Sequence, residues 1–333
     1  MAVTDITHPA TTWDGHLREV LHMRVFVTGA SGWIGSAVVP ELIGSGHHVS
    51  GLARSGASAD ALIAAGVEVH RGTLDDLDTL KRAAEAADGV IHLAFKHDEA
   101  FSGDFQGASD ADRRVVETFG AVLAGSDRPF LIASGTLGLA PGRVATEADG
   151  RELEPNATIP HGGPQTRLGT AQLTISFASE GVRSCVVRLP PTCHGDGDNG
   201  FMAALVGVGR ATGVSGYIGD GTNRWPATHR LDVAHLFKLA LEKAPAGSAL
   251  HAVAEEGVPL RQIAEVIGRH LDLPVTSISP EDASEHFGFL AGFLGLDSPA
   301  SSERSRELLN WHPSQPGLLD DLDQGHYFLD RAA

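Results

Sequence analysis

RVFVTGASGWIG, residues 24–35, is the stretch of this sequence that decides its fold. A short β-rich run leads into three glycines at three-residue spacing, Gly29, Gly32 and Gly35, and then into a segment with helical apolar spacing. In a dinucleotide-binding unit the first glycine makes a tight turn. The second lets the backbone approach a pyrophosphate, and the third lets the helix pack closely on the strand. The spacing is GxxGxxG rather than the commoner GxGxxG, so the position between strand and helix carries the interpretation.

The residues up to 190 continue this alternation. Strands are predicted at residues 48–54, 68–72, 89–95, 129–135 and 183–190, and helices at 58–66, 75–88, 108–125 and 166–181. Strands that alternate with helices imply right-handed crossovers and a parallel sheet. We therefore expect an α/β fold, a Rossmann-type doubly wound parallel sheet followed by a smaller C-terminal α/β substrate-binding region.

The domain organisation follows from where this rhythm changes. We expect an N-terminal extension (1–22), a dinucleotide-binding domain (23–190) joined by part of 228–254, and a region for a small-molecule substrate (191–333). Met23 directly precedes the first strand, so a start at Met23 is an alternative. Residues 135–164 carry little secondary-structure signal, and loops of that length are usually functional or disordered.

The composition of the chain limits the kinds of partner and the cellular location that we expect. The net charge of −17, from 42 acidic and 25 basic residues, argues against a nucleic-acid partner because a polyanion meets general repulsion. No apolar stretch is long enough to span a membrane, and residues 1–22 lack the features of a secretory signal. Cys185 and Cys193 show neither a pairing motif nor zinc-ligand spacing. We expect a cytoplasmic protein with no membrane and no metal.

The end of the second predicted strand selects the cofactor. An acidic residue there suits a free ribose hydroxyl, whereas an arginine suits a 2′-phosphate. The sequence offers Arg54 and Ser55, with no acid. NADP is therefore expected over NAD, and the alternative is an arginine that is simply solvated at a strand end.

Several segments together resemble the short-chain dehydrogenase/reductase superfamily, in its extended and atypical branch of epimerase/dehydratase-like proteins. They are VTGASGWIG (27–35), LARS (52–55), HLAF (92–95), ASGTLG (133–138) and VVRLPPTCHG (186–195). The resemblance implies a homodimer, and it implies that the cofactor contacts Gly29, Ser31, Gly32, Trp33, Ile34, Gly35, Arg54, Ser55, Leu74, Leu93, Ala94, Phe95, Arg167 and Pro190.

The family's Tyr-x-x-x-Lys pair, whose tyrosine exchanges a proton with substrate, occurs nowhere in this sequence. Alignment by distance to the next strand puts Gly163 at the tyrosine position and Arg167 at the lysine position. A shift of two residues, to Gln165 and Gly169, stays open.

The remaining members of the family's catalytic set have candidates. Ser134 and Thr136 both fit the serine position, and Asp112 falls where an asparagine is usual, a feature of the atypical branch. Asp112 could act as an acid if buried, although a cap or first-turn residue of a helix is the favoured alternative.

Another side chain must carry the proton. An arginine stays protonated, so Arg167 can only anchor a ribose or phosphate. His161, two residues before the vacant tyrosine position, and His194, in the loop after the sixth strand, are the candidates because histidine titrates near neutrality. An ordinary loop or surface role is the alternative for each.

Two functions remain at this stage. The first is an NADP-dependent oxidoreductase or epimerase/dehydratase-like enzyme that acts on a small carbonyl or alcohol by hydride transfer with a non-standard proton donor. The second is an NADP-binding sensor or regulatory protein, as the missing tyrosine and lysine suggest. The long loops after residue 190 favour the enzyme.

Overall fold

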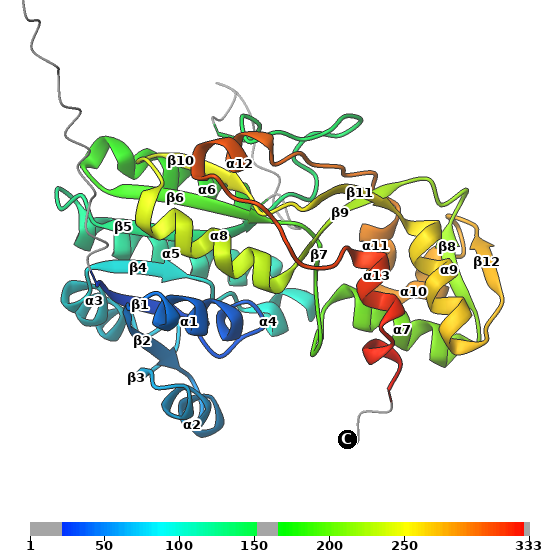
Figure 1. The fold of residues 1–333 in the computed structure, drawn as a ribbon, viewed down its shortest axis with the longest axis horizontal. Coiled ribbons are helices and arrows are strands. Elements are labelled where there is room, and N and C mark those ends of the chain that lie inside the picture. Colours follow the sequence, from blue (N-terminus) through cyan, green and yellow to red (C-terminus); the bar gives the residue numbers. More distant parts are fainter. Residues whose placement is uncertain (1–21, 152–165, 330–333) are drawn as a thin grey trace, which may run out of the picture.

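A computed structural model describes residues 22–151 and 166–329 of the 333-residue chain. Its larger part is a parallel sheet of seven strands in the order β10-β6-β5-β4-β1-β2-β3 (Figure 1). The strands are β1 (Arg24–Thr28), β2 (His48–Ala53), β3 (Glu68–Arg71), β4 (Gly89–His92), β5 (Pro129–Gly135), β6 (Arg183–Leu189) and β10 (Ser248–His251). The order reverses between β1 and β4, and in open α/β sheets ligands bind where the order reverses, at the carboxyl ends of the strands.

Helices cover both faces of this sheet. They are α1 (Gly35–Gly44), α2 (Gly56–Ala64), α3 (Leu77–Ala86), α4 (His97–Phe101), α5 (Phe105–Leu123), α6 (Thr166–Ser176) with the short η1 (Phe177–Glu180), α8 (Arg230–Lys243) and α12 (Glu303–Leu309). One core cluster lies between the sheet and α1, α2 and α8, and the other lies between the sheet and α3, α5 and α6. The fold is the expected doubly wound Rossmann-type sheet.

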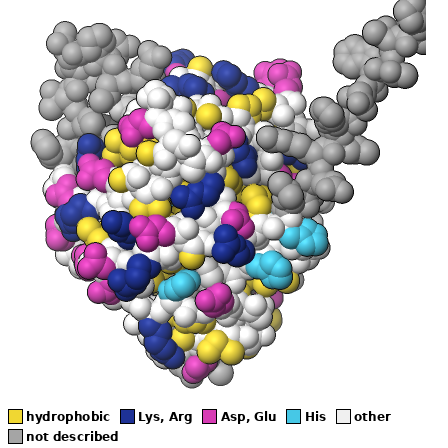
Figure 2. Space-filling model, turned by 90° about the vertical axis from the view of Figure 1, so that its left-hand side faces the viewer, with side chains coloured by type: hydrophobic (Ala, Val, Ile, Leu, Met, Phe, Trp, Pro, Cys, Tyr) yellow, Lys and Arg dark blue, Asp and Glu magenta, His cyan; other side chains and the backbone are white. Residues whose placement is uncertain are grey.

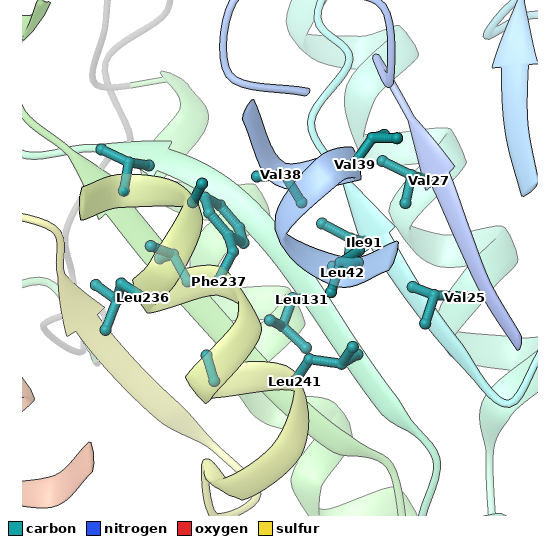
Figure 3. Close-up of a cluster of buried hydrophobic side chains, with 14 of the residues drawn as sticks. Val25, Val27, Val38, Val39, Leu42, Ile91, Leu131, Leu236, Phe237 and Leu241 are labelled. Atoms are coloured by element: carbon teal, nitrogen blue, oxygen red, sulfur yellow. The ribbon is translucent and has the colours of Figure 1, made fainter. Parts of the chain in front are cut away.

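Figure 3 shows the first of these cores. Apolar residues of the central strands, such as Val25, Val27 and Ile91, lie against Leu42 of α1 and Phe237 of α8. All five side chains are fully buried. Because α8 comes from residues 230–243, the C-terminal half of the chain helps to close the first sheet.

The remaining elements form a second, smaller body, called the small lobe below (Figure 1). It has a three-stranded sheet in the order β11-β9-β7, a two-stranded sheet β12-β8, and its own core. Its elements are β7 (Thr192–His194), α7 (Phe201–Thr212), β8 (Ser215–Ile218), β9 (Arg224–His229), β11 (Glu255–Pro259), α9 (Leu260–Leu271), β12 (Val275–Ile278), α10 (Ala283–Phe287), η2 (Gly288–Leu290), α11 (Ala291–Leu294), α13 (Leu318–Asp323) and η3 (His326–Phe328).

The chain after α12 returns to the small lobe as a strap (310–317). The indole of the fully buried Trp311 donates to the carbonyl of Asp232. The Asp232 carboxylate in turn accepts from the backbone amides of Ser314 and Gln315, at 2.9 and 3.1 Å. One buried carboxylate at the start of α8 thus fixes the path of the strap.

Three elements differ from the sequence prediction. β4 ends at His92, so residues 93–95 form a loop rather than strand, and the short helix α4 follows where none was expected. The helix expected at 108–125 begins at Phe105, because Asp104 caps it by accepting from the amide of Gly107. Of the long loop at 135–164, residues 136–151 contain only an isolated bridge from Ala145 to Ala300, and 152–164 lie outside the described residues.

The surface at the end of the sheet farthest from the small lobe is mixed in charge. Figure 2 shows acidic and basic side chains interspersed across this face. Over the described ranges, no helix is long and apolar enough to cross a membrane.

Candidate cofactor and active site

The glycine turn between β1 and α1 has the geometry of a phosphate cradle. Gly29 has a φ of +69°, and a Cβ there would lie 2.8 Å from the amide nitrogen of Ala94. A Cβ on Gly35 would lie 2.0 Å from the carbonyl oxygen of Gly29. Side chains are therefore excluded at both positions. Between them, Ser31 and Gly32 are exposed beside the start of α1. The turn fits the pyrophosphate of a dinucleotide.

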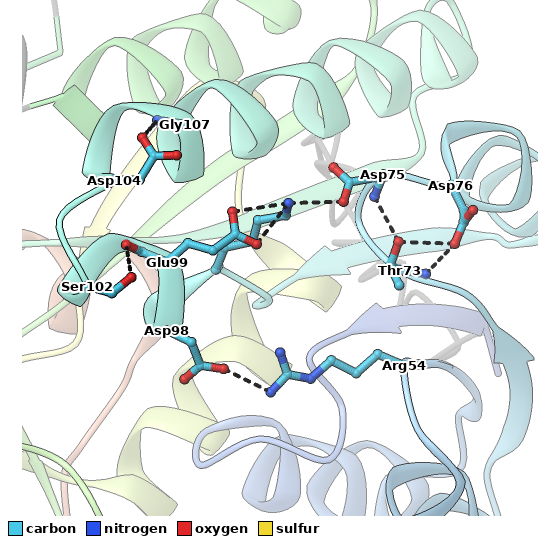
Figure 4. A network of polar contacts seen from close by, with 10 residues as sticks. Arg54, Thr73, Asp75, Asp76, Asp98, Glu99, Ser102, Asp104 and Gly107 are labelled. Atoms are coloured by element: carbon cyan, nitrogen blue, oxygen red, sulfur yellow. Dashed lines mark hydrogen bonds and ion pairs between the residues drawn. The ribbon is translucent and has the colours of Figure 1, made fainter.

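A rim of charged side chains crosses the ends of β2, β3 and β4 (Figure 4). Arg54 lies 3.3 Å from Asp98 of α4, and their side chains are 75% and 83% exposed. Lys96 bridges Asp75 and Glu99 at 3.0 and 3.2 Å. An ion pair as exposed as Arg54–Asp98 contributes little to stability, so the guanidinium is free to turn toward an incoming anion.

Two further residues expected at the cofactor lie on this side. The Ser55 hydroxyl caps α2 by accepting from the amide of Ser58, and Leu74 after β3 is buried.

Below the cradle, a buried chain of polar groups links β1 to α5. Thr28 Oγ1 lies 2.6 Å from His92 Nδ1, and His92 Nε2 lies 3.1 Å from Asp112 Oδ1. As a carboxylate, Asp112 can only accept, so His92 donates from Nε2. With a neutral imidazole, the Thr28 hydroxyl then donates to Nδ1. Thr28 Oγ1 also accepts from the amide of Ala94. The chain ties the wall of the cradle to the interior of α5.

This placement corrects the expectation that Asp112 is a cap or first-turn residue. The helix starts at Phe105 and its cap is Asp104, so Asp112 lies in the helix interior and is 2% exposed. A buried carboxylate needs polar partners, and His92 supplies one.

Arg167, on the first turn of α6, reaches the same place. Its Nη2 donates to the carbonyl of Ala133 at 2.8 Å. Its buried Nε has no hydrogen-bond partner among the described residues and lies 3.9 Å from Asp112 Oδ2. Its guanidinium also lies 4.3 Å from the ring centre of Phe95. The next residue of β5, Ser134, is buried. Thr136 is fully buried, and its amide donates to the carbonyl of Leu189.

Sequence reasoning missed His97, the first residue of α4. Its ring packs edge-on against Phe95, with centroids 5.0 Å apart. Burial lowers the pKa of His97, and the nearby charge of Arg167 lowers it further. The residue is exposed at the carboxyl end of the sheet, but the groups packed around the ring keep the imidazole neutral at pH 7. Its position just after the HLAF segment was the signal available in the sequence.

The two histidines expected to carry a proton are placed differently. His161 lies outside the described residues, as do Gly163 and Gln165. His194 is fully buried in the small lobe, where its Nδ1 lies 2.9 Å from Asp321 Oδ2 and its ring packs against His229.

Trp33 in the glycine turn joins this site to the small lobe. Its indole donates to the carbonyl of Cys193 at 2.8 Å, and the guanidinium of Arg230 lies 4.3 Å from the indole ring centre. Pro190, also expected near the cofactor, is buried just before this contact and accepts from the thiol of Cys193. The glycine turn and the small lobe are thus in direct contact.

Comparisons with known proteins agree with this arrangement. Residues 25–128 match the model of the NAD dependent epimerase/dehydratase family. An uncharacterized protein of Schizosaccharomyces pombe is 49% identical over 307 residues, which are 92% of this chain and all of that protein. The "4-hydroxy-2-methyl-3-oxo-4-farnesyl-3,4-dihydroquinoline-1-oxide ketoreductase" of Stigmatella aurantiaca is 28% identical over 72% of this chain and 70% of its own.

A solved structure shows the same fold. UDP-glucose 4-epimerase of Thermotoga maritima superposes with a TM-score of 0.69, at 18% identity, over 92% of this chain and 98% of its own. The chain belongs to the NAD-dependent epimerase/dehydratase family, in the short-chain dehydrogenase/reductase superfamily.

Proposed function

We propose that this protein is an NADP-dependent oxidoreductase of the epimerase/dehydratase type, which interconverts a small carbonyl compound and its alcohol. The observation that carries the proposal is the glycine turn, where packing leaves no space for a Cβ at Gly29 and Gly35 and the residues between them, Ser31 and Gly32, are exposed, as a pyrophosphate turn requires. The ketoreductase named above is a relative by sequence and supports the reaction class.

Each end of the cofactor has candidate contacts. The phosphates would lie on the turn at Ser31 and Gly32, and Arg54 would leave Asp98 for the 2′-phosphate. Arg167 would anchor the nicotinamide ribose, in the role of the family's lysine. When bound, NADPH supplies a hydride to the carbonyl carbon and becomes NADP⁺, while the carbonyl oxygen takes one proton.

His97 is the group we assign to that oxygen. In the reducing direction its imidazolium form gives the proton to the oxygen and becomes neutral imidazole, and in the oxidising direction the neutral imidazole accepts the proton of the alcohol. Ser134, at the end of the neighbouring strand, would share the oxygen. Asp112 is a positioning residue that does not contact the substrate, because its carboxylate faces Arg167 and His92 rather than open space.

The cofactor assignment is tested by titration calorimetry of NADPH and NADH. Arg54→Ala should weaken NADPH by about tenfold, since one exposed charge-assisted contact is lost, and change NADH by less than about twofold. Arg82→Ala, an exposed arginine of α3, is the control and should change neither. Equal losses of NADPH and NADH in Arg54→Ala would refute the 2′-phosphate contact.

Catalysis is tested with a panel of ketones and aldehydes, following NADPH absorbance. Oxidation of the matching alcohol should rise with pH through a pKa below 6.5 and stay level above it, because His97 must be neutral to accept a proton. His97→Gln should lose this pH dependence and keep NADPH affinity. Tight NADPH binding with no turnover of any compound would instead support the regulatory alternative.

A further inference from the structure

We infer that the substrate is an aromatic or polycyclic apolar ketone that carries no phosphate, held by a rim of aromatic side chains where the two lobes meet. The inference rests on the oxidoreductase activity proposed above and names its substrate class. The aromatic rim consists of Phe95, His97, Phe101, Phe105 and Phe289.

The aromatic rim begins at the candidate active site. The guanidinium of Arg167 lies over Phe95, whose ring centre is 5.9 Å from that of Phe105. On the other side, the Phe95 ring packs against His97, and His97 stacks on Phe101 with centroids 5.9 Å apart and planes 27° apart. The rings therefore form a continuous path away from the group that would hold the nicotinamide ribose.

The path ends by crossing to the small lobe. Phe101 of α4 contacts Phe289 of η2, with ring centroids 5.6 Å apart. Although they touch, the two residues are 47% and 56% exposed. Two phenylalanines from separate lobes thus leave about half of their surface open beside the reacting end. Exposed apolar surface rimmed by polar groups marks binding sites.

The charges of the small lobe disfavour the usual alternative, a nucleoside diphosphate sugar. Such a ligand carries two phosphates that need free cations. In the described part of the small lobe, each arginine already has a partner, and the arginine–carboxylate pairs there are closer and less exposed than Arg54–Asp98. Arg210 donates to the carbonyl of Phe328, and the other three arginines, Arg224, Arg261 and Arg269, pair with Asp297, Glu265 and Asp323.

The chemistry of the aromatic rim therefore favours a flat, uncharged ligand. Aromatic faces gain from stacking and from displaced water, and the rim offers no strong acceptor or free cation to a sugar or a diphosphate. A neutral His97 adds a face for stacking and an N–H for one ketone oxygen.

The test compares acetone, acetophenone and 2-acetylnaphthalene as substrates with NADPH, and UDP-glucose with NADP⁺. Catalytic efficiency, kcat/KM, should rise about 100-fold from acetone to 2-acetylnaphthalene, as expected for burying two aromatic rings. Calorimetry on the complex with NADP⁺ should detect binding of 2-acetylnaphthalene and no binding of UDP-glucose.

Two variants test whether the aromatic rim is the cause of the preference for aromatic ketones. Phe289→Ala should lower kcat/KM for 2-acetylnaphthalene about tenfold and weaken its binding similarly, while acetone changes less than about twofold. Leu308→Ala, on α12 and 44% exposed, is a matched exposed apolar control and should behave as wild type. Size-exclusion chromatography with light scattering should show the same mass for both variants.

The outcomes separate the inference from the proposed function. Reduction of all three ketones with equal efficiency, or binding of UDP-glucose, overturns the inference while the oxidoreductase stands. Phe289-dependent binding of 2-acetylnaphthalene without turnover supports the aromatic rim as the binding site for such ketones but overturns the oxidoreductase activity, and with it their role as substrates. A change of mass in Phe289→Ala shows that a second copy covers the rim and overturns the inference.

Discussion

Replacing Asp112 by asparagine should destabilise the protein by about 1–3 kcal/mol and loosen Arg167. At 3.9 Å and an effective dielectric constant near 20, the attraction between the two charges is about 4 kcal/mol. Removing the carboxylate also removes its desolvation cost, which offsets part of this loss. The carbonyl oxygen of the introduced amide can still accept from His92, so the hydrogen bond at 3.1 Å is retained in kind.

Urea unfolding at pH 7, with the free energy of unfolding compared between variant and wild type, measures this effect. Because the Asp112 side chain is 3% exposed, the difference should be nearly the same at low and high salt. Glu117→Gln, on the same helix, is the matched control. Its pair with Arg113 is shorter, 2.9 Å, but both side chains are 49% exposed.

We expect Glu117→Gln to lower the free energy of unfolding by less than about 0.5 kcal/mol, and we expect even this difference to disappear in high salt. Asp112→Asn should in addition weaken NADPH binding, since Arg167 loses the charge that orients it. If Asp112→Asn unfolds like wild type, or if its effect is screened by salt as in the control, the buried pair does not hold Arg167 and the reasoning fails.

Three further predictions concern other parts of the chain. Gly35→Ala should cost about 3 kcal/mol by thermal or urea unfolding, because its Cβ would meet the carbonyl of Gly29, whereas Gly44→Ala in open space should cost nothing. Burial, with the nearby charge of Arg188, lowers the pKa of His251 to about 4. As the pH falls, the unfolded chain binds a proton at His251 near pH 6.5, before the folded protein does. The stabilisation that comes from the neutral imidazole is therefore complete above pH 6.5, and the free energy of unfolding should fall by roughly 3 kcal/mol toward pH 4. His251→Gln should reduce this pH dependence. NADPH should quench tryptophan emission, and Trp33→Phe should abolish most of that change. An unchanged signal would place the cofactor away from the glycine turn.

The parts of the fold that follow local rules were predictable. The glycine spacing in residues 24–35 predicts the turn from strand to helix, and the alternation of strands and helices up to residue 190 implies the parallel sheet. The order of the strands depends on long-range packing. The elements α8 and β10 lie within 228–254, the range that we expected to join the first domain. The position of α4 was missed because its five residues, HDEAF, are too few to show a clear helical periodicity.

The candidate site was predictable only in part. Asp112 lies four residues after Ala108 and four before Val116, both buried, so helical spacing alone places it on the apolar face. That signal indicates a buried carboxylate and a partner, but it cannot name His92, which comes from another element. The contact of Arg167 with Phe95 likewise depends on how the start of α6 meets the loop after β4.

The return of α8 and β10 to the first sheet decides how this chain can be divided. A fragment that stops at residue 190 lacks β10, so β6 becomes an edge strand with an unpaired row of amides and carbonyls. It also lacks Phe237, whose loss uncovers the apolar side of α1. Such a fragment would pair edge to edge with its own copies and aggregate. The cofactor-binding unit is therefore discontinuous in sequence, and any functional truncation must extend at least through His251.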